Sequence, residues 1–307
     1  MVSQENTVII VAGPTAVGKT SVAIQLAKYF DTEIISADSR QCYKELDIGV
    51  GRPSAEELAE IQHHFIASHS IHDKQTAASF EQFALAKTAE LFQKKKVVVL
   101  AGGTGLYIKA FCEGLDEIPT IPEALRSSIS QAYQEHGLSW LQEQVKTFDP
   151  RFYESGETLN PQRLMRALEV VNSTGQSILD FRNIGRKERD FHMIGIALEL
   201  PKPLLHQNIN HRVDVMMERG WLDEVQTLVP YQDLNALQTV GYKELFAYLN
   251  TNPSLEETIE QIKLNTRKYA KRQLTWFKKD KQFAWFHPQD IAAIIEHLSG
   301  RGVTPAF

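Results

Sequence analysis

The sequence predicts an α/β protein in which helices cover a parallel sheet, with a helical segment inserted into the chain. Two observations support this fold class. Short apolar runs alternate with segments of helical periodicity through residues 7–103, and a long stretch without a convincing strand separates the third run from the fourth. Strands that alternate with helices typically form a parallel sheet covered on both faces.

Four short apolar runs are the expected strands: residues 7–13, 32–39, 95–103 and 191–200. A helix is expected at 19–30, directly after the first run. Another is expected around 78–95, where apolar residues recur at three- and four-residue spacing. After residue 200 the pattern is helical almost throughout.

Residues 121–185 show helical patterns and no strand. We therefore expect a discontinuous core, formed by residues 1–120 and 186–307, that carries the sheet and the C-terminal helices. Residues 121–185 would form a helical insertion domain.

The composition is that of a globular protein. Of 307 residues, 43% are hydrophobic and 23% are charged, and the net charge of −5 indicates no overall attraction to nucleic acid. The two cysteines, Cys42 and Cys112, offer no disulfide framework. No apolar stretch approaches the roughly 20 residues of a membrane span. We expect a cytoplasmic monomer that does not associate with membranes.

The first expected strand leads into a glycine-rich motif, Gly13-Pro14-Thr15-Ala16-Val17-Gly18-Lys19-Thr20. Its spacing is that of a P-loop, in which backbone N–H groups of the turn and of the helix N-terminus point at an anion. Lys19 adds a point charge, and Thr20 can ligate Mg²⁺. The motif predicts a P-loop NTPase-like core, a bound phosphate group and Mg²⁺ as cofactor.

An acidic residue follows the second expected strand. Asp38, in "IISADSRQCY", would lie beside the phosphate loop because ligands in such sheets bind at the carboxyl ends of the strands. In an NTPase it would support Mg²⁺ and water, and in a transferase it would act as a general base. It could also be a helix N-cap or turn residue.

Local basic segments are compatible with an RNA partner. Residues 263–279 interleave seven lysines and arginines with Tyr269, Trp276 and Phe277, which suits either RNA contact or a solvated helix face with aromatics in the core. Arg163 and Arg166 lie three residues apart and would share a helix face. They could contact RNA or form an ordinary surface pair. Four histidines match no established metal-ligand spacing: His63, His64, His69 and His72.

Eight motifs occur in the order found in the tRNA dimethylallyltransferases, the IPP transferase family: GPTAVGKT, ISADSRQCYKELDIGVGRPS, HHF, AGGTGLYIKA, NPQRLMRALEV, HQNINHRVDVMMERG, TVGYKE and RKYAKRQLTWF. The resemblance runs from about residue 8 to residue 286. Two segments depart from the family pattern. Arg52 stands where the family usually has a lysine, and the usual Leu-Ile-Asp after the histidines is missing.

The resemblance implies transfer of a dimethylallyl group from dimethylallyl diphosphate to the N6 amine of the adenosine 3′ to the anticodon, position 37, of tRNA. The loop 13–20 and Arg212 would hold the diphosphate, rather than ATP. Asp38 would contact the amine, with Lys19 and Thr104 as further catalytic residues. The residues implied to contact the tRNA anticodon stem-loop are Asp38, Ser39, Arg40, Gln41, Thr104, Arg126, Gln162, Arg163, Leu164, Met165 and Arg166.

Two alternatives share the phosphate loop. A small-molecule kinase would bind ATP there, but nothing in the sequence specifies its phosphoryl acceptor. A non-enzymatic, nucleotide-switched RNA-binding protein would keep the basic segments and would need no base at Asp38.

Overall fold

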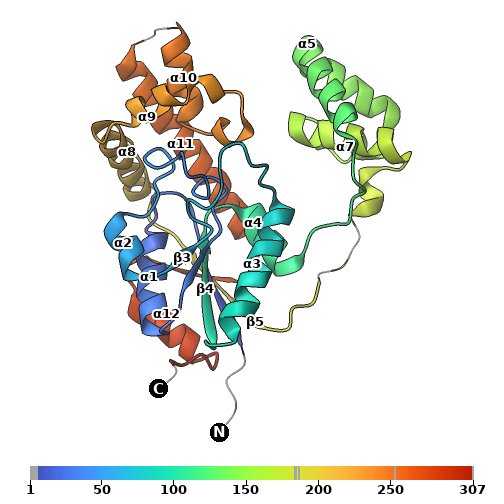
Figure 1. The fold of residues 1–307 in the computed structure, drawn as a ribbon. Coiled ribbons are helices and arrows are strands. Elements are labelled where there is room, and N and C mark those ends of the chain that lie inside the picture. The colour runs from blue at the N-terminus through green and yellow to red at the C-terminus, as the bar shows by residue number, and fades with distance from the viewer. Residues whose placement is uncertain (1–5, 183–184, 186, 252–253, 306–307) are drawn as a thin grey trace. The chain divides into compact units, whose positions relative to one another are not determined.

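The structure is a computed structural model that describes residues 6–182, 185, 187–251 and 254–305. The chain divides into two compact units (Figure 1). The first comprises Met1–Glu113 and Glu188–Phe307, and the second comprises Gly114–Lys187. The expected helical insertion, 121–185, falls inside the second unit. In the described part of the chain, no helix is both long enough and apolar enough to span a bilayer.

The first unit contains a sheet of six strands, all parallel, in the order β3-β2-β4-β1-β5-β6. Their bounds are β1 Thr7–Ala12, β2 Ile34–Ser36, β3 His63–His64, β4 Val97–Gly102, β5 His192–Leu198 and β6 Phe283–Phe286. The predicted α/β fold class is confirmed, and the four predicted strands are present. The two edge strands, β3 and β6, were not predicted, because both are short and only half-buried.

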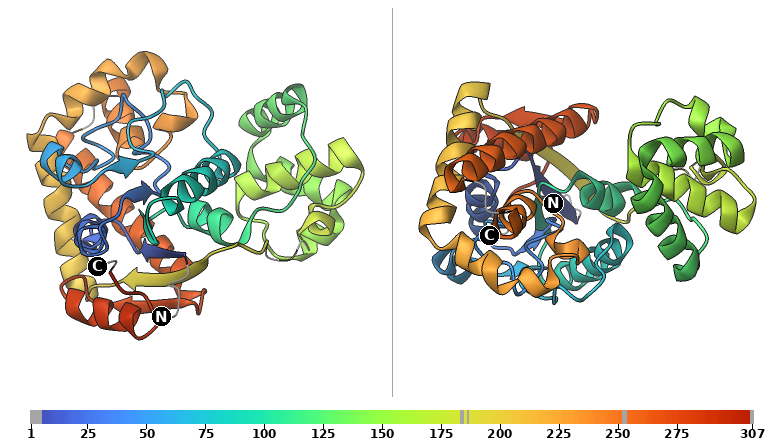
Figure 2. Two further views of the ribbon diagram at one scale, coloured as in Figure 1. Left: turned by 60° about the horizontal axis from the view of Figure 1, so that its bottom comes forward. Right: turned by 90° about the horizontal axis from the view of Figure 1, so that it is seen from above.

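The central strand β1 is buried along its whole length, as expected of an inner strand in a parallel sheet. Val8 and Ile10 face a core shared with α3 (Ala77–Phe92) and α4 (Gly105–Glu113). Ile9 and Val11 face the opposite core, shared with α1 (Lys19–Tyr29) and α12 (Ile291–Ser299). These two helices lie on the side of the sheet away from α3 (Figure 2). Because successive side chains of a strand alternate between faces, one apolar run supplies both cores.

The remaining helices of the first unit are α2 Ala55–Glu60, α8 Lys202–Glu218, α9 Trp221–Thr227, α10 Tyr242–Thr251 and α11 Leu255–Lys278. Short 3-10 turns occupy Val229–Tyr231 and Asn235–Leu237. The long helices α8 and α11 pack along each other. Together with α10 they supply side chains to the cavity that lies at the strand ends.

The second unit is helical and has its own apolar core. It contains α5 Glu123–Phe148, α6 Pro150–Glu154, α7 Pro161–Thr174 and a 3-10 turn at Ile178–Phe181. Gly137, at φ +76°, interrupts α5. The buried carboxylate of Asp149 ties these pieces together. It accepts hydrogen bonds from the Phe152 N–H (3.1 Å), the Ser177 hydroxyl (2.9 Å) and the Ile178 N–H (3.3 Å).

Replacing Asp149 with alanine should lower the free energy of unfolding of the second unit by roughly 2–4 kcal/mol, because three buried donors lose their charged acceptor. Native-state hydrogen exchange in urea, read by peptide, would localise the loss to residues 114–187. Asp290→Ala is the matched control, since Asp290 is an exposed helix N-cap without a side-chain cap hydrogen bond. Unchanged protection in the second unit of the Asp149 variant would contradict this account.

Candidate functional site

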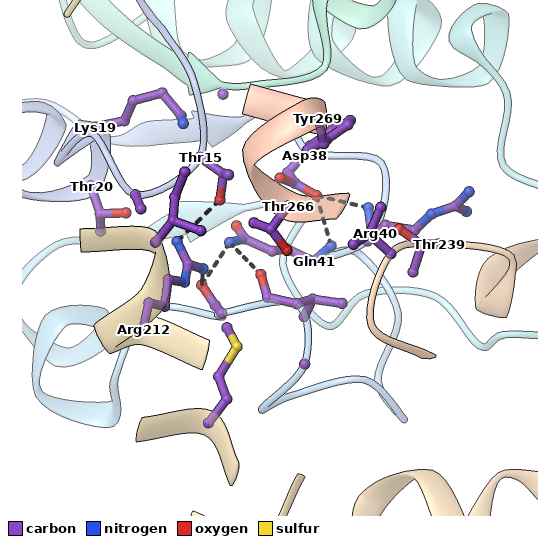
Figure 3. Close-up of a pocket in the computed structure, with 18 of the residues that line it drawn as sticks. Thr15, Lys19, Thr20, Asp38, Arg40, Gln41, Arg212, Thr239, Thr266 and Tyr269 are labelled. Carbon is purple, nitrogen blue, oxygen red and sulfur yellow. Dashed lines mark hydrogen bonds between the residues drawn. The ribbon is translucent and has the colours of Figure 1, made fainter. Parts of the chain in front are cut away.

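A cavity of about 1110 Å³ lies at the carboxyl end of the sheet, within the first unit. Its walls come from the phosphate loop after β1, from the segment after β2, from residues 49–53, and from helices α8, α10 and α11 (Figure 3). This is the edge at which open α/β sheets bind ligands.

The phosphate loop has the geometry of an anion site. Gly13 and Gly18 adopt positive φ angles of 149° and 101°. A side chain at Gly13 would also approach the Leu198 carbonyl oxygen to 2.9 Å. Helix α1 begins at Lys19 and has no side-chain cap, so its first N–H groups are open to a ligand. Thr15, Ala16, Gly18, Lys19 and Thr20 all line the cavity.

Two cations lie at this loop. The Lys19 ammonium donates to the Pro14 carbonyl (2.7 Å). Burial lowers the pKa of Lys19 from 10.5 to about 8; the Asp38 carboxylate opposes this change, and the Arg212 guanidinium adds to it. Arg212, from α8, donates to the Thr15 hydroxyl (3.4 Å) and the Gly51 carbonyl (3.3 Å), and burial lowers its pKa as well. Two partly desolvated positive groups beside open amides favour a multiply charged anion.

Asp38 lies in the same cavity and is fixed by its own turn. One carboxylate oxygen, Oδ1, accepts the backbone N–H groups of Arg40 (2.9 Å) and Gln41 (3.2 Å) (Figure 3). The other oxygen makes no hydrogen bond within the described residues. Asp38 is therefore a turn residue, one of the roles considered from the sequence. Its second carboxylate oxygen remains available to a ligand.

Thr104 lies behind the cavity wall and joins two strand ends. Its N–H donates to the Ala37 carbonyl (3.2 Å), and its hydroxyl accepts the Ser39 N–H (3.1 Å). A Cβ on Gly102 would lie 2.1 Å from the Ala37 carbonyl oxygen, so the end of β4 approaches the end of β2 as closely as only glycine allows. These contacts fix the backbone on both sides of Asp38.

The segment 47–53 supplies one wall of the cavity through Gly49, Val50, Gly51 and Pro53. Side chains from two other places hold this segment. Gln41, expected to contact tRNA, donates to the carbonyls of Val50 (3.3 Å) and Gly51 (2.9 Å). The Glu224 carboxylate accepts the N–H groups of three consecutive residues: Asp47 (3.0 Å), Ile48 (2.7 Å) and Gly49 (3.1 Å). Nothing in the sequence indicates this role for Glu224, because its partners are backbone groups.

Arg52, which departs from the family pattern, has a structural role. Its guanidinium donates to the carbonyls of Tyr43 (2.8 Å), Lys44 (3.1 Å) and Leu46 (2.5 Å). These bonds stabilise the turn that precedes the wall. The arginine in place of the family's usual lysine therefore stabilises a segment next to the cavity.

The other residues expected to contact tRNA lie on the second unit. Arg126 and Arg166 share the carboxylate of Glu169, at 3.6 and 3.1 Å, and Arg163 pairs with Glu157 at 2.6 Å.

Gln162 is exposed and Met165 is half-buried. Leu164 is completely buried in the core of this unit, so its side chain offers no surface to RNA.

In the basic segment 263–279, some side chains are paired or buried and others are exposed. Lys263 and Lys278 are paired with acidic residues, Arg267 donates to Asn210, and Phe277 is buried in the core. The exposed aromatic side chains are Tyr269 and Trp276. Lys271, Arg272, Trp276 and Lys279 line a small hollow, and the Arg272 guanidinium lies 5.7 Å from the centre of the Tyr269 ring. The face thus combines cations with exposed aromatic rings.

The four histidines do not converge on one point. His64 pairs with Glu33 at 2.6 Å, His63 contacts the Ile61 carbonyl and His69 contacts Ser68. Within the described ranges, no cluster of three or more histidine, cysteine or acidic side chains could hold a metal ion.

A family model described as IPP transferase matches residues 41–280 of this chain. The chain is 47% identical to the tRNA dimethylallyltransferase of Christiangramia forsetii over 281 residues, which is 92% of this chain and 93% of that protein. It is 45% identical to the tRNA dimethylallyltransferase of Flavobacterium johnsoniae, over 94% of this chain and 96% of that one.

Solved structures agree. The tRNA isopentenylpyrophosphate transferase of Bacillus halodurans is 32% identical and superposes with a TM-score of 0.71, covering 97% of each chain. A eukaryotic dimethylallyltransferase acting on tRNA is 25% identical, with a TM-score of 0.73, and the match covers 97% of this chain and 77% of that one. The resemblance drawn from the motifs is confirmed, and this chain belongs to the IPP transferase family.

Proposed function

We propose that this chain transfers a dimethylallyl group from dimethylallyl diphosphate to the N6 amine of the adenosine 3′ to the anticodon, position 37, of tRNA, and releases diphosphate. The observation that carries the proposal is that one cavity contains both a phosphate loop with two cations and a fixed carboxylate, Asp38. Membership of a family whose relatives are named tRNA dimethylallyltransferases supports the same reaction.

At the donor end, the open amides at the start of α1, Lys19 and Arg212 would neutralise the charge that grows on the diphosphate as its bond to the allylic carbon breaks. Apolar side chains in the same cavity, such as Val213, Met216 and Val240, offer surface for the dimethylallyl group.

The residues present fit Mg²⁺ held mainly by the substrate. The Thr20 hydroxyl lines the cavity beside the loop, and the described residues lack a cluster of acidic or histidine ligands. Mg²⁺ in phosphate sites usually takes one or two protein ligands together with substrate oxygens and water. Thr20 would supply the protein ligand, and the ion would add positive charge at the leaving group.

At the acceptor end, the adenine amine is a weak nucleophile because its lone pair is delocalised into the ring. The open oxygen of Asp38 would accept a proton from the amine as the nitrogen–carbon bond forms. The base must leave the stack of the anticodon loop to reach this cavity, as in other enzymes that act on bases.

The RNA partner is supported by two basic faces. One is on α11, with Lys271, Arg272 and Trp276. The other is a pair of arginines on the second unit, Arg163 and Arg166, which are bound to glutamates in this structure. Cations beside exposed aromatic rings suit contact with phosphates and unstacked bases. We expect the chain to act as a monomer.

The proposal is tested by incubating the protein with undermodified tRNA, Mg²⁺ and either dimethylallyl diphosphate or ATP. Digestion of the tRNA and mass spectrometry should find the dimethylallyl group on the adenosine 3′ to the anticodon. Phosphorylated product in the ATP reaction, without prenyl transfer in the other, would favour a kinase instead.

Asp38→Asn should slow single-turnover transfer by roughly 10²–10⁴-fold, because it removes the proton acceptor and keeps the shape of the side chain. Affinity for tRNA and for the diphosphate should change little. Asp31→Asn is the matched control, because Asp31 is an exposed carboxylate whose partner is the surface residue Lys95.

The Mg²⁺ dependence of the Asp38 variant separates two roles. A loss that disappears at high Mg²⁺ would mean that Asp38 supports the metal rather than accepting the proton. A near-normal rate at ordinary Mg²⁺ would exclude both roles.

The dissociation constant of dimethylallyl diphosphate should be constant between about pH 7, where the diphosphate is fully ionised, and about pH 8, and should rise by up to about tenfold per pH unit above that. Below its pKa of about 8, Lys19 already carries its proton in the free protein. Above that pH, binding must take up a proton, because the diphosphate stabilises the ammonium. Calorimetry in two buffers of different ionisation enthalpy would measure the uptake.

Lys19→Arg is the control for this pH dependence. Arginine keeps its charge throughout, so the dependence should vanish in the variant even if its affinity is lower. A wild-type dissociation constant that stays flat to about pH 10 would contradict the assignment of Lys19 to the diphosphate.

Replacing Arg163 and Arg166 together with alanine should weaken tRNA binding and reduce the slope of log affinity against log salt by about one unit for each phosphate that the variant no longer neutralises. Their present partners, Glu157 and Glu169, would have to exchange for phosphate on binding. Arg301→Ala, an exposed arginine after α12, is the control. If the double variant kept the wild-type salt slope, the two arginines would be an ordinary surface pair.

A further inference from the structure

A single buried amide links the two halves of the cavity. Gln273, on α11, is only 7% exposed. Its Oε1 accepts the backbone N–H of Thr15 in the phosphate loop (2.9 Å), and its Nε2 donates to the carbonyl of Gly103, after β4 (2.9 Å). Both ends of the side chain are thus used, each by a different strand-end loop.

The contact on the Gly103 side leads directly to the acceptor side of the cavity. Gly103 precedes Thr104, whose N–H and hydroxyl hold the backbone of Ala37 and Ser39. These two residues flank Asp38. A continuous series of hydrogen bonds therefore runs from Thr15 through Gln273 to the backbone around the carboxylate.

Space around the amide is limited. A Cβ on Gly103 would lie 2.4 Å from the Gln273 Nε2 and 3.5 Å from the Lys19 Nζ. A side chain at position 103 would displace the Gln273 amide from its hydrogen bonds. The pairing of β1 with β4 brings the phosphate loop and Gly103 close together, and the Gln273 side chain bridges them.

We propose that Gln273 is a positioning residue for the transfer reaction: it fixes the distance between the diphosphate-binding loop and the loop of Thr104 that holds the acceptor side. This inference rests on the function proposed above. Transfer requires the amine nitrogen to approach the allylic carbon in line with the departing diphosphate, and a misplacement of about 1 Å can slow such a reaction about 10²-fold. Neither substrate has to touch Gln273 for this effect.

Gln273→Met tests the inference, because methionine has similar length and volume but cannot make either hydrogen bond. At saturating concentrations of both substrates, single-turnover transfer should fall roughly 10–100-fold, since the reacting groups are no longer aligned. The dissociation constants of dimethylallyl diphosphate and tRNA should stay within about threefold of wild type, less than a 1 kcal/mol change. Gln261→Met makes the same replacement at an exposed position of the same helix and should behave as wild type.

A double-mutant cycle with Thr104→Ala separates positioning from general support of the fold. If Gln273 acts through the loop of Thr104, the Gln273→Met replacement should cost much less in the Thr104→Ala background than in wild type. An equal fold-loss in both backgrounds would overturn the inference. A normal rate in Gln273→Met would do the same, as would a loss explained entirely by weaker substrate binding.

Gln273→Asn is the second variant, for the case that methionine prevents folding. Asparagine keeps the amide but is one methylene shorter, so it can reach only one of the two loops, and the same loss of rate is expected. The proposed function is judged separately, on the wild-type protein and Gln261→Met. If these transfer no dimethylallyl group, the proposed function fails; if they do and both Gln273 variants match them, only the positioning role fails.

Discussion

The close approach of three strand ends at one edge of the parallel sheet is the constraint on which the site depends. Strands β2, β4 and β1 are neighbours, so the segments that follow them meet. At Gly102 the approach is so tight that a Cβ would lie 2.1 Å from the Ala37 carbonyl oxygen. The phosphate loop, Thr104 and Asp38 are the direct continuations of these strands. A rigid sheet therefore brings the phosphate loop and the Asp38 carboxylate into one cavity.

Helices that come much later in the chain complete the cavity. α8 brings Arg212 to the phosphate loop, and α9 brings the Glu224 carboxylate to three successive amides of the wall at residues 47–49. Tyr242 also donates its hydroxyl to Glu224, at 2.5 Å. A charged acceptor on backbone amides makes strong hydrogen bonds. The wall is thereby fixed to the helical layer as well as to the sheet.

The inner strands and the phosphate loop could be predicted from the sequence, because burial on both faces requires continuous apolar runs and the loop requires glycines at fixed spacing. The edge strands β3 and β6 could not, since short, half-buried strands leave no such pattern. Asp38 could be predicted as a site residue from its position directly after a strand. Arg212 and Thr104 could be predicted only from the resemblance to a family. Glu224 accepts hydrogen bonds from backbone N–H groups, and no sequence pattern identifies such partners. Phe277 illustrates the converse: an aromatic residue in a basic segment can simply belong to the core.

The proposed reaction requires one cavity to hold the diphosphate and the target amine together. The most direct measurement is a crystal structure of the protein with an unreactive thio-analogue of dimethylallyl diphosphate and an anticodon stem-loop. We expect the phosphates on the open amides of the phosphate loop, beside Lys19 and Arg212. We also expect an unstacked adenosine. Its amine should lie within hydrogen-bonding distance of Asp38 Oδ2, the carboxylate oxygen that accepts no hydrogen bond from the turn. A diphosphate bound away from the loop, or an adenosine amine held by a different carboxylate, would contradict the proposed site.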